Sequence, residues 1–592
     1  MSKGSSVLKA FFEIPFEDKL QYIEKNFNDD VFESFMVQKG FEKVYRLSIE
    51  SHKKDQLVAH IINSFDTHFE EATNVYHFIE CFFPVADDIR KQIKKIIADN
   101  FENSLIQFYY YLGLYVSGHP LTISTAKHII ISIANDVLSN DLEIVNFTLS
   151  ISFASNKNKK IAIEKCYDLA IKLGVLIEKY DAICFGREKI ASVSNLGVPR
   201  VSLLLSDQEY EYGLLYGSAF NNIMSVHRAN EEPGVIHHFY KCMICKYCGI
   251  YLIEDSIKDN LFELLSRQFA VRNLTDIFFY FTGDVQSYLF SLVAYIYVKI
   301  LLLFFCTSTT MQLIPHSTIK KEILWGDRIS EEEYNLLIKC LTEQSAFNNW
   351  VQYTTKGIII GRWQLDLDIS IPEMVNKTIL NSHSHSELGK VSNVFGKSIY
   401  EKIVRDICEK CGCKVVPYSI RKKEDKKTIT DIDLLAYNDG IVIVGQIKIA
   451  NCGRTPYELW KAKQVIQKAI EQENLSIKAL NKDGSLLFSI LKKNNIVENK
   501  NEIKTVIPII ITSSSYYLGF GKHVGIPVVC LDMYQQILSY LNEINSPEKI
   551  KNYLDNPFDL YDVPINNTIE KSIIDQDEFY IEYEEIEEIF AE

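Results

Sequence analysis

The sequence lacks several features from which a function is commonly inferred. It has no glycine-rich phosphate loop of the Walker type, so nothing in it indicates an NTPase. The formal net charge of -14 excludes a generally basic coat, and any surface for nucleic acid must therefore be local. The 13 cysteines form no even framework of pairs, which suits a reducing cytoplasm. Residues Met1 to Ala10 are polar, and we expect no secretory signal there.

The pattern along the chain predicts a multidomain protein. With 592 residues, 47% of them hydrophobic, the chain is long enough for three or so domains with cores of their own. Helical periodicity with few glycines and prolines dominates the beginning, but no fixed repeat period can be counted. We expect a mostly α-helical sensor or recruitment region at 1–185, a mixed α/β middle region at 186–380, an α/β domain at 381–548 and an acidic tail at 549–592.

The middle region contains the longest apolar run of the chain. Val285 to Cys306 has the length of a membrane span, and Lys299 is its only formal charge. Because a charge inside a bilayer is costly, we expect one or two buried helices rather than a span, and a protein that purifies without detergent. Strands are expected at Val201–Leu205 and Gly357–Leu367, and a linker around His383 and His385.

One cysteine cluster is a candidate zinc site. Its four potential ligands are Cys242, Cys245, Cys248 and the nearby His238. Structural zinc usually requires two such knuckles, and only one is convincing here, so we favour a cysteine-rich helix over zinc. A second pair, Cys408 and Cys411, is adequately explained as core and helix end.

The strongest functional signal is a hairpin at residues 430–449. Two β-prone runs flank Asp439-Gly440, a strong signal for a two-residue turn. With that turn, Asp433 lies opposite Gln446 and Asp431 lies opposite Lys448, so that two acids, an amide and a lysine share one face. The apolar side chains expected on the opposite face are Ile432, Leu434, Ile447 and Ile449.

Such a polar patch suits phosphodiester hydrolysis. Mg²⁺ prefers oxygen ligands and keeps several waters, so one or two carboxylates and a carbonyl can hold it against a phosphate. The cation would lower the pKa of a water molecule, while Lys448 orients that water or offsets the charge that builds on the phosphate.

These residues resemble a known family. Asp433, followed by Gln446-x-Lys448 and preceded by a helix that carries Glu401, resembles the PD-(D/E)XK nuclease superfamily, and the glutamine resembles its Mrr-type restriction endonuclease branch. The likeness covers residues 390–535 and implies a restriction-endonuclease-like α/β core in the order α-β-β-β-α-β with a further strand. The expected elements are a helix from Phe395 to Gly412, a strand at Lys414–Ile420, the hairpin, a helix at Trp460–Gln467, and strands at Val506–Ile511 and Ile526–Cys530.

The resemblance implies a role for each residue. Asp433 and Glu401 would bind Mg²⁺ or Mn²⁺, and Lys448 would be the catalytic lysine. Gln446 would contribute its amide oxygen to the same cation, as a ligand or a ligand-positioner, and Ile447 its backbone carbonyl. Candidates for supporting roles are Asp431, Lys461 and Gln464. The implied activity is a cytoplasmic DNA endonuclease, with restriction or defence against foreign DNA as its role.

The sequence departs from the family at one position, where Gln446 replaces the usual acid and removes a negative charge from the metal site. Three alternatives therefore stay open. The hairpin also fits an ordinary sheet whose outer face is solvated. A nuclease fold that binds nucleic acid without cutting it, or a regulatory scaffold, fits the same residues. Besides DNA, a protein partner or a second copy is a candidate to bind through the N-terminal helical region.

Two charged segments flank this domain. A basic cluster before the hairpin is a candidate DNA-binding surface, although a solvated loop fits it equally well; it comprises Lys414, Arg421, Lys422, Lys423, Lys426 and Lys427. Residues 570–592 are strongly acidic with interleaved isoleucine and tyrosine. We favour a mobile, solubilising tail over one that mimics nucleic acid or docks on a partner.

Overall fold

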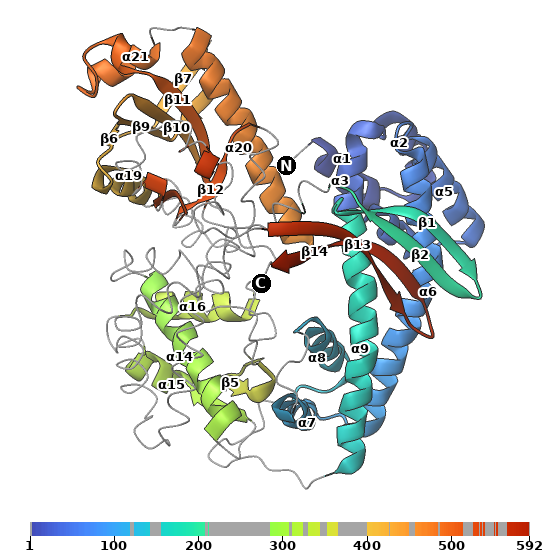
Figure 1. The fold of residues 1–592 in the computed structure, drawn as a ribbon. Helices are drawn as coiled ribbons and strands as arrows, with labels where there is room; N and C mark the ends of the chain where they lie inside the picture. Colours follow the sequence, from blue (N-terminus) through green and yellow to red (C-terminus); the bar gives the residue numbers. More distant parts are fainter. Residues whose placement is uncertain are drawn as a thin grey trace.

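The structure is a computed structural model of the whole chain. It describes residues 3–118, 124–141, 156–207, 211, 285–306, 311–323, 329–343, 352–364, 400–424, 427–448, 456–482, 486–512, 525–531, 533–535, 537–538, 550, 552–554 and 565–590. The candidate zinc ligands around Cys242 and the linker around His383 lie outside these residues. The described part combines helices with several separate sheets, as expected for a mixed α/β chain (Figure 1).

The first part of the chain is helical, as its periodicity predicts. Its elements are α1 (Lys3–Glu13), α2 (Phe16–Asn26), α3 (Asp29–Val37), α4 (Gly40–Tyr45), α5 (Ser51–Asn63), α6 (Phe69–Asn100), α7 (Leu105–Gly118), α8 (Ser124–Val137) and α9 (Lys157–Cys184). Helix α9 begins where the Asn156 side chain accepts hydrogen bonds from two backbone N–H groups, which satisfies donors that have no partner inside the helix. Figure 1 shows α6 and α9 side by side, and apolar residues of both share one core.

A four-stranded sheet covers these helices, and half of it comes from the end of the chain. The strands are β1 (Glu188–Leu196), β2 (Val198–Leu205), β13 (Ile565–Asp575) and β14 (Tyr580–Phe590), in the order β1-β2-β14-β13. Strand β14 runs parallel to β2, with Ile581 opposite Val201. Phe579 and Ile581 are fully buried in the helical core. The expected mobile acidic tail is therefore wrong for residues 565–590, because Phe579 and Ile581 are buried and Ile574 and Tyr583 pack against the same core.

The middle elements pack in part against the helical core, which includes their residues Met311, Ile359 and Trp363. They are α14 (Val285–Cys306), β3 (Met311–Pro315), α15 (His316–Thr318), η3 (Ile319–Ile323), α16 (Glu331–Glu343), β4 (Gln352–Tyr353), β5 (Gly357–Gly361) and η5 (Arg362–Gln364). The apolar run is one helix, α14, whose buried side chains include Ile296 and Ile300. In the described ranges no helix has the length and apolar character needed to cross a bilayer. The strand predicted at Gly357–Leu367 ends at Gly361, where the chain turns so that the buried Trp363 stacks on Tyr109 at 4.7 Å.

The third part is built on a five-stranded sheet. Its elements are α19 (Glu401–Lys410), β6 (Lys414–Val415), β7 (Ile420–Glu424), β8 (Lys427–Ile432), β9 (Leu434–Asn438), β10 (Ile441–Lys448), α20 (Pro456–Lys482), α21 (Leu486–Lys493), η8 (Lys500–Glu502), β11 (Thr505–Thr512) and β12 (Val528–Cys530). The strand order is β12-β11-β10-β9-β6, with β10, β11 and β12 parallel and β9 antiparallel to β10. The order of elements along the chain is the expected one, with β7, β8 and α21 added.

Helices cover both faces of this sheet. On one face, α19 packs on side chains such as Ile443 and Ile447. On the other face, α20 and α21 pack on side chains such as Val442, Val444 and Ile510. Helix α19 ends at Lys410, with Cys411 as its C-cap, and Gly412 follows with a φ of 84°, a conformation that glycine adopts without strain. Cys408 lies in the core, as expected.

Candidate functional site: a polar cluster under helix α20

The predicted hairpin turn is present and sets the register of the site. Asp439 and Gly440 both have positive φ, 41° and 93°, as a turn that matches the twist of the flanking strands requires. Strands β9 and β10 pair in the predicted register, with Leu434 opposite Gly445. The local sequence signal therefore correctly predicted which residues of the two strands face each other.

The register changes at Asp433, where the chain bends. The backbone N–H of Asp433 donates to Gly445 O at 3.2 Å, but β8, which precedes the bend, pairs with β7. Asp431 therefore lies opposite Arg421 instead of Lys448, and the expected pairing of Asp431 with Lys448 is wrong. Ile432 packs in the core under α20 instead of with Leu434, because the bend reverses the alternation of side chains.

The bend brings three of the predicted side chains together. Lys448 Nζ donates to Asp433 Oδ2 at 3.3 Å and to Gln446 Oε1 at 2.9 Å. Asp433 Oδ2 also accepts a hydrogen bond from Ile447 N at 3.0 Å, and the Gln446 amide nitrogen donates to Asp431 O. Asp433 is 7% exposed and Gln446 is fully buried. A buried amide and a buried carboxylate thus share one lysine on the face that α20 covers.

Glu401 lies beside this cluster at the start of α19. Its Oε2 accepts hydrogen bonds from Arg405 at 2.9 Å and from Ser419 at 2.8 Å. The same Arg405 nitrogen donates to Asp433 O at 2.9 Å. Burial raises the pKa of the Glu401 carboxyl, Ser419 and Arg405 lower it, and the charge of Asp433 raises it further. Arg405 therefore links Glu401 to the bend that positions Asp433.

Glu473 of α20 also faces the cluster, and the sequence analysis missed it. The side chain is fully buried, and within the part of the chain that the structure describes neither carboxyl oxygen makes a hydrogen bond. Burial, followed by the charge of Asp433, raises the pKa of Glu473 to about 8, while Lys448 and Gln446 lower it in part. An unpaired buried carboxyl group is costly to the fold and calls for an explanation.

A signal for Glu473 is present in the sequence. The buried residues of α20 recur every three or four positions, as on one face of a helix. They are Pro456, Leu459, Ala462, Ile466, Ala469, Glu473, Ser476 and Leu480. Glu473 is the one charged residue in this stripe. The predicted helix, Trp460–Gln467, was too short to include it, whereas α20 continues to Lys482.

Other predicted residues lie elsewhere. Gln464 donates from Nε2 to Glu33 Oε1 at 3.3 Å, and the Lys461 ammonium lies 4.5 Å from the centre of the Tyr457 ring. Both residues are near the beginning of α20, several turns before Glu473. The basic residues Arg421, Lys422 and Lys423 belong to β7, and Lys427 begins β8, whereas Lys426 lies outside the described residues. The basic positions therefore belong to a two-stranded ladder that ends next to Asp433.

The donor set of the cluster fits a hard divalent cation. Carboxylate oxygens of Asp433 and Glu473 and the amide oxygen of Gln446 are ligands of the kind that Mg²⁺ and Mn²⁺ prefer. The unsatisfied oxygens of Glu473 are the structural observation that favours this fit. In the described ranges, no group of three or more His, Cys, Asp or Glu side chains is arranged to hold a metal. The cluster instead combines carboxylates with an amide, and Glu401 is already engaged by Arg405.

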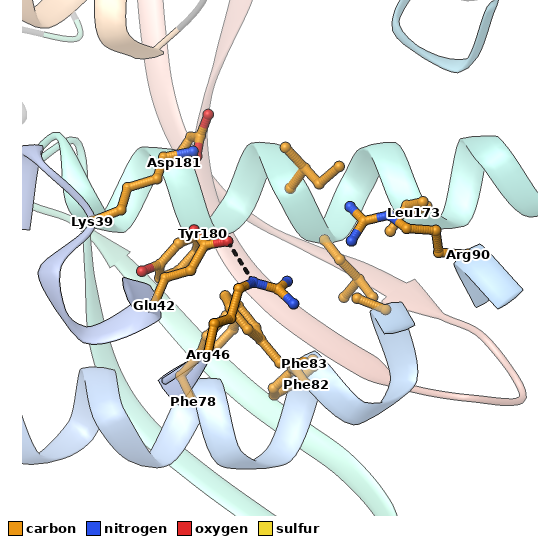
Figure 2. Close-up of a pocket in the computed structure, with 13 residues that line it drawn as sticks. Lys39, Glu42, Arg46, Phe78, Phe82, Phe83, Arg90, Leu173, Tyr180 and Asp181 are labelled. Atoms are coloured by element: carbon orange, nitrogen blue, oxygen red, sulfur yellow. Dashed lines mark hydrogen bonds and ion pairs between the residues drawn. The ribbon is translucent and has the colours of Figure 1, made fainter. Parts of the chain in front are cut away.

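A cavity of about 180 Å³ lies away from this cluster, between α4, α6 and α9 (Figure 2). Aromatic and aliphatic side chains form its walls, and its cations are already paired with acids. Lys39 pairs with Asp181 at 2.5 Å, and Arg46 pairs with Glu42 at 3.0 Å. The cavity therefore carries no cation that is free to hold an anionic ligand.

Comparison of the chain with protein-family models, with curated proteins and with solved structures gives no match. The function must therefore be argued from the chemistry of the cluster itself.

Proposed function

We propose that the C-terminal α/β region is a metal-dependent endonuclease that hydrolyses phosphodiester bonds of DNA. The observation that carries this proposal is the hydrogen bonding of Lys448 to both Asp433 and Gln446 on one sheet face. A lysine held between a carboxylate and an amide oxygen suits a reaction in which negative charge builds on a phosphate.

Each residue of the cluster has a role in this proposal. Asp433, Gln446 through its amide oxygen, and the Ile447 carbonyl hold Mg²⁺ or Mn²⁺, with Glu401 in support. A bound cation supplies Lewis acidity toward a phosphoryl oxygen and lowers the pKa of water. Lys448 orients the attacking water or offsets the charge on the phosphate. Arg405, bonded to both Glu401 and Asp433 O, positions the bend.

The choice of DNA and of a role in defence against foreign DNA follows from the resemblance to Mrr-type nucleases. The basic positions of β7 and β8 support a nucleic-acid substrate, because lysine and arginine neutralise backbone phosphates. Strand β8 runs directly into the bend at Asp433. A duplex held by this ladder would therefore have its backbone next to the cluster.

We further propose that the helical N-terminal region controls the nuclease. Near its beginning α20 contacts that region, where Gln464 bonds to Glu33, and Lys463 pairs at 3.0 Å with Asp207, which lies two residues after β2. The ring of Phe185, directly after α9, lies 5.3 Å from that of Tyr457. Further along, the same helix carries Glu473 over the cluster. A partner or a second copy that binds the helical region would thus act on the helix that covers the site (Figure 1).

A second candidate function is nucleic-acid binding without cleavage. The glutamine at position 446 favours it, because an amide brings no negative charge to attract a cation. If the protein binds no DNA either, the remaining alternative is a regulatory scaffold.

Cleavage of supercoiled plasmid by the intact protein tests the proposal. Nicked or linear product should appear in Mg²⁺ or Mn²⁺ and disappear in EDTA. Asp433→Ala should abolish cleavage, because it removes the central carboxylate, whereas Glu409→Ala at an exposed site on α19 should cleave like the unmodified protein. Cleavage that survives both EDTA and Asp433→Ala contradicts the metal-nuclease mechanism. DNA binding without cleavage under every metal condition supports the second candidate.

A further inference from the structure

Glu473 is a buried carboxyl group beside Gln446 and Lys448, both of which lower its pKa, yet neither neighbour satisfies its oxygens. Both of its oxygens are inaccessible, and neither is hydrogen-bonded within the described residues. Lys448, whose charge acts on Glu473, makes its hydrogen bonds to Asp433 and Gln446. A carboxylate in such a place destabilises the fold unless a ligand uses it.

We propose that Glu473 is a metal ligand supplied by α20, and that it replaces the carboxylate that Gln446 does not provide. This inference rests on the proposed function and deepens it. Helix α20, which covers the sheet, thus supplies the carboxylate ligand that the β9–β10 hairpin lacks.

The packing of α20 supports this assignment. Ala469 and Ser476, one turn before and one turn after Glu473 on the same helix face, are fully buried small residues. Small neighbours let the helix lie close to the sheet, and Asp433, Lys448 and Gln446 act on the Glu473 carboxyl at this point. Ser476 donates its hydroxyl to Gln472 O and leaves Glu473 unpaired.

The charges of the cluster lead to the same conclusion. The Glu401 carboxylate is paired with Arg405, and Lys448 offsets Asp433. Gln446 is neutral. Without Glu473, a divalent cation would meet one carboxylate that a lysine already pairs. With Glu473, two carboxylates face the cation, within the one or two that a Mg²⁺ site commonly uses.

The test measures Mn²⁺ binding to the full chain, independently of DNA cleavage. Protein freed of metal with EDTA and then dialysed is titrated with Mn²⁺, and free Mn²⁺ is followed by electron paramagnetic resonance. The variants are Glu473→Gln, the matched control Glu471→Gln at an exposed position on the same helix, and the double variant Gln446→Glu with Glu473→Gln. Glu473→Gln keeps the shape of the side chain and removes its ability to ionise, and thermal unfolding in EDTA checks that it folds.

We expect Glu473→Gln to raise the dissociation constant for Mn²⁺ at least about tenfold, because a neutral amide is a weaker ligand than a carboxylate. Glu471→Gln should bind as the unmodified protein does. The double variant should recover most of the affinity, because it returns the acid to the strand.

Each result decides between the claims. Unchanged Mn²⁺ affinity in Glu473→Gln overturns the inference, and metal-dependent cleavage by the same protein would leave the proposed function intact. Weakened binding without recovery in the double variant refutes the claim that Glu473 takes the place of an acid at position 446. Glu473-dependent Mn²⁺ binding without cleavage of any DNA supports this inference and overturns the nuclease.

Discussion

Trp460 donates a hydrogen bond from its indole nitrogen Nε1 to Oε1 of Glu33 at 3.3 Å, although 427 positions separate the two residues. Gln464 donates to the same oxygen. One carboxylate of α3 therefore receives two donors from the first turns of α20. The helix that carries Glu473 is tied by this contact to the helical region.

This contact predicts that a change in α3 alters the nuclease. Glu33→Ala removes the acceptor of both hydrogen bonds, and we expect the plasmid cleavage rate to change by roughly two- to tenfold, the effect of one or two net hydrogen bonds. Asp30→Ala, also on α3, is the control. Equal cleavage rates for Glu33→Ala, Asp30→Ala and the unmodified protein would refute control through α20.

We expect a substitution of Lys448 to reduce cleavage without weakening metal binding, unlike a substitution of a metal ligand. Lys448→Ala should lower cleavage by about a hundredfold or more, because the lysine acts on water and phosphate, while Mn²⁺ affinity stays within a fewfold of the original. Lys468→Ala, at an exposed position on α20, should affect neither measurement. A loss of Mn²⁺ binding as large as the loss of cleavage would show that Lys448 organises the metal site instead.

The metal-free protein should lose stability as the pH rises, through Glu473. Burial raises the pKa of this carboxyl to about 8 in the folded protein, from an ordinary value of 4.5, against the partial offset of Lys448 and Gln446. Between these two pH values the unfolded chain has released the proton and the folded protein keeps it. Stability is therefore highest below the ordinary pKa and falls as the pH rises toward about 8.

Glu473→Gln cannot release this proton, so it should gain stability relative to the unmodified protein over the same pH interval. In EDTA, its thermal midpoint should exceed that of the unmodified protein by an amount that grows from about pH 5 to about pH 8. Glu471→Gln should show a constant difference. Parallel curves of midpoint against pH for Glu473→Gln and the unmodified protein would mean that Glu473 ionises normally.

The acidic hairpin should contribute to the stability of the helical region. Ile581→Ala removes a fully buried side chain of β14 and should cost about 2–4 kcal/mol, as a cavity in a packed core does. Ile573→Ala is the matched control on β13, where the side chain is 58% exposed, and should change stability little. Urea unfolding measures both. If residues 565–590 were a mobile tail, the two variants would have the same free energy of unfolding.

The sequence by itself determined the features that depend only on residues close together in the sequence. Asp439-Gly440 selects a tight turn because both positions take positive φ, and that turn decided the pairing of Leu434 with Gly445. The period of apolar residues predicted that the described residues up to Cys184 are mostly helical, and Lys299 within the apolar run favoured a buried helix for α14. These features depend on local backbone preferences and on which face of an element is apolar, and both can be read from short segments.

Only the tertiary structure decided the contacts between distant segments. The bend at Asp433 arises because β8 pairs with β7 instead of continuing along β10, a choice between partners that lie outside the hairpin. The acidic hairpin pairs with β2 because buried Val201 and Leu203 offer it an apolar neighbour, although hundreds of residues lie between them. Glu473 meets Gln446 because α20 crosses the sheet at that point. The place where a helix crosses a sheet depends on the packing of whole surfaces, and no local pattern in the sequence specifies it.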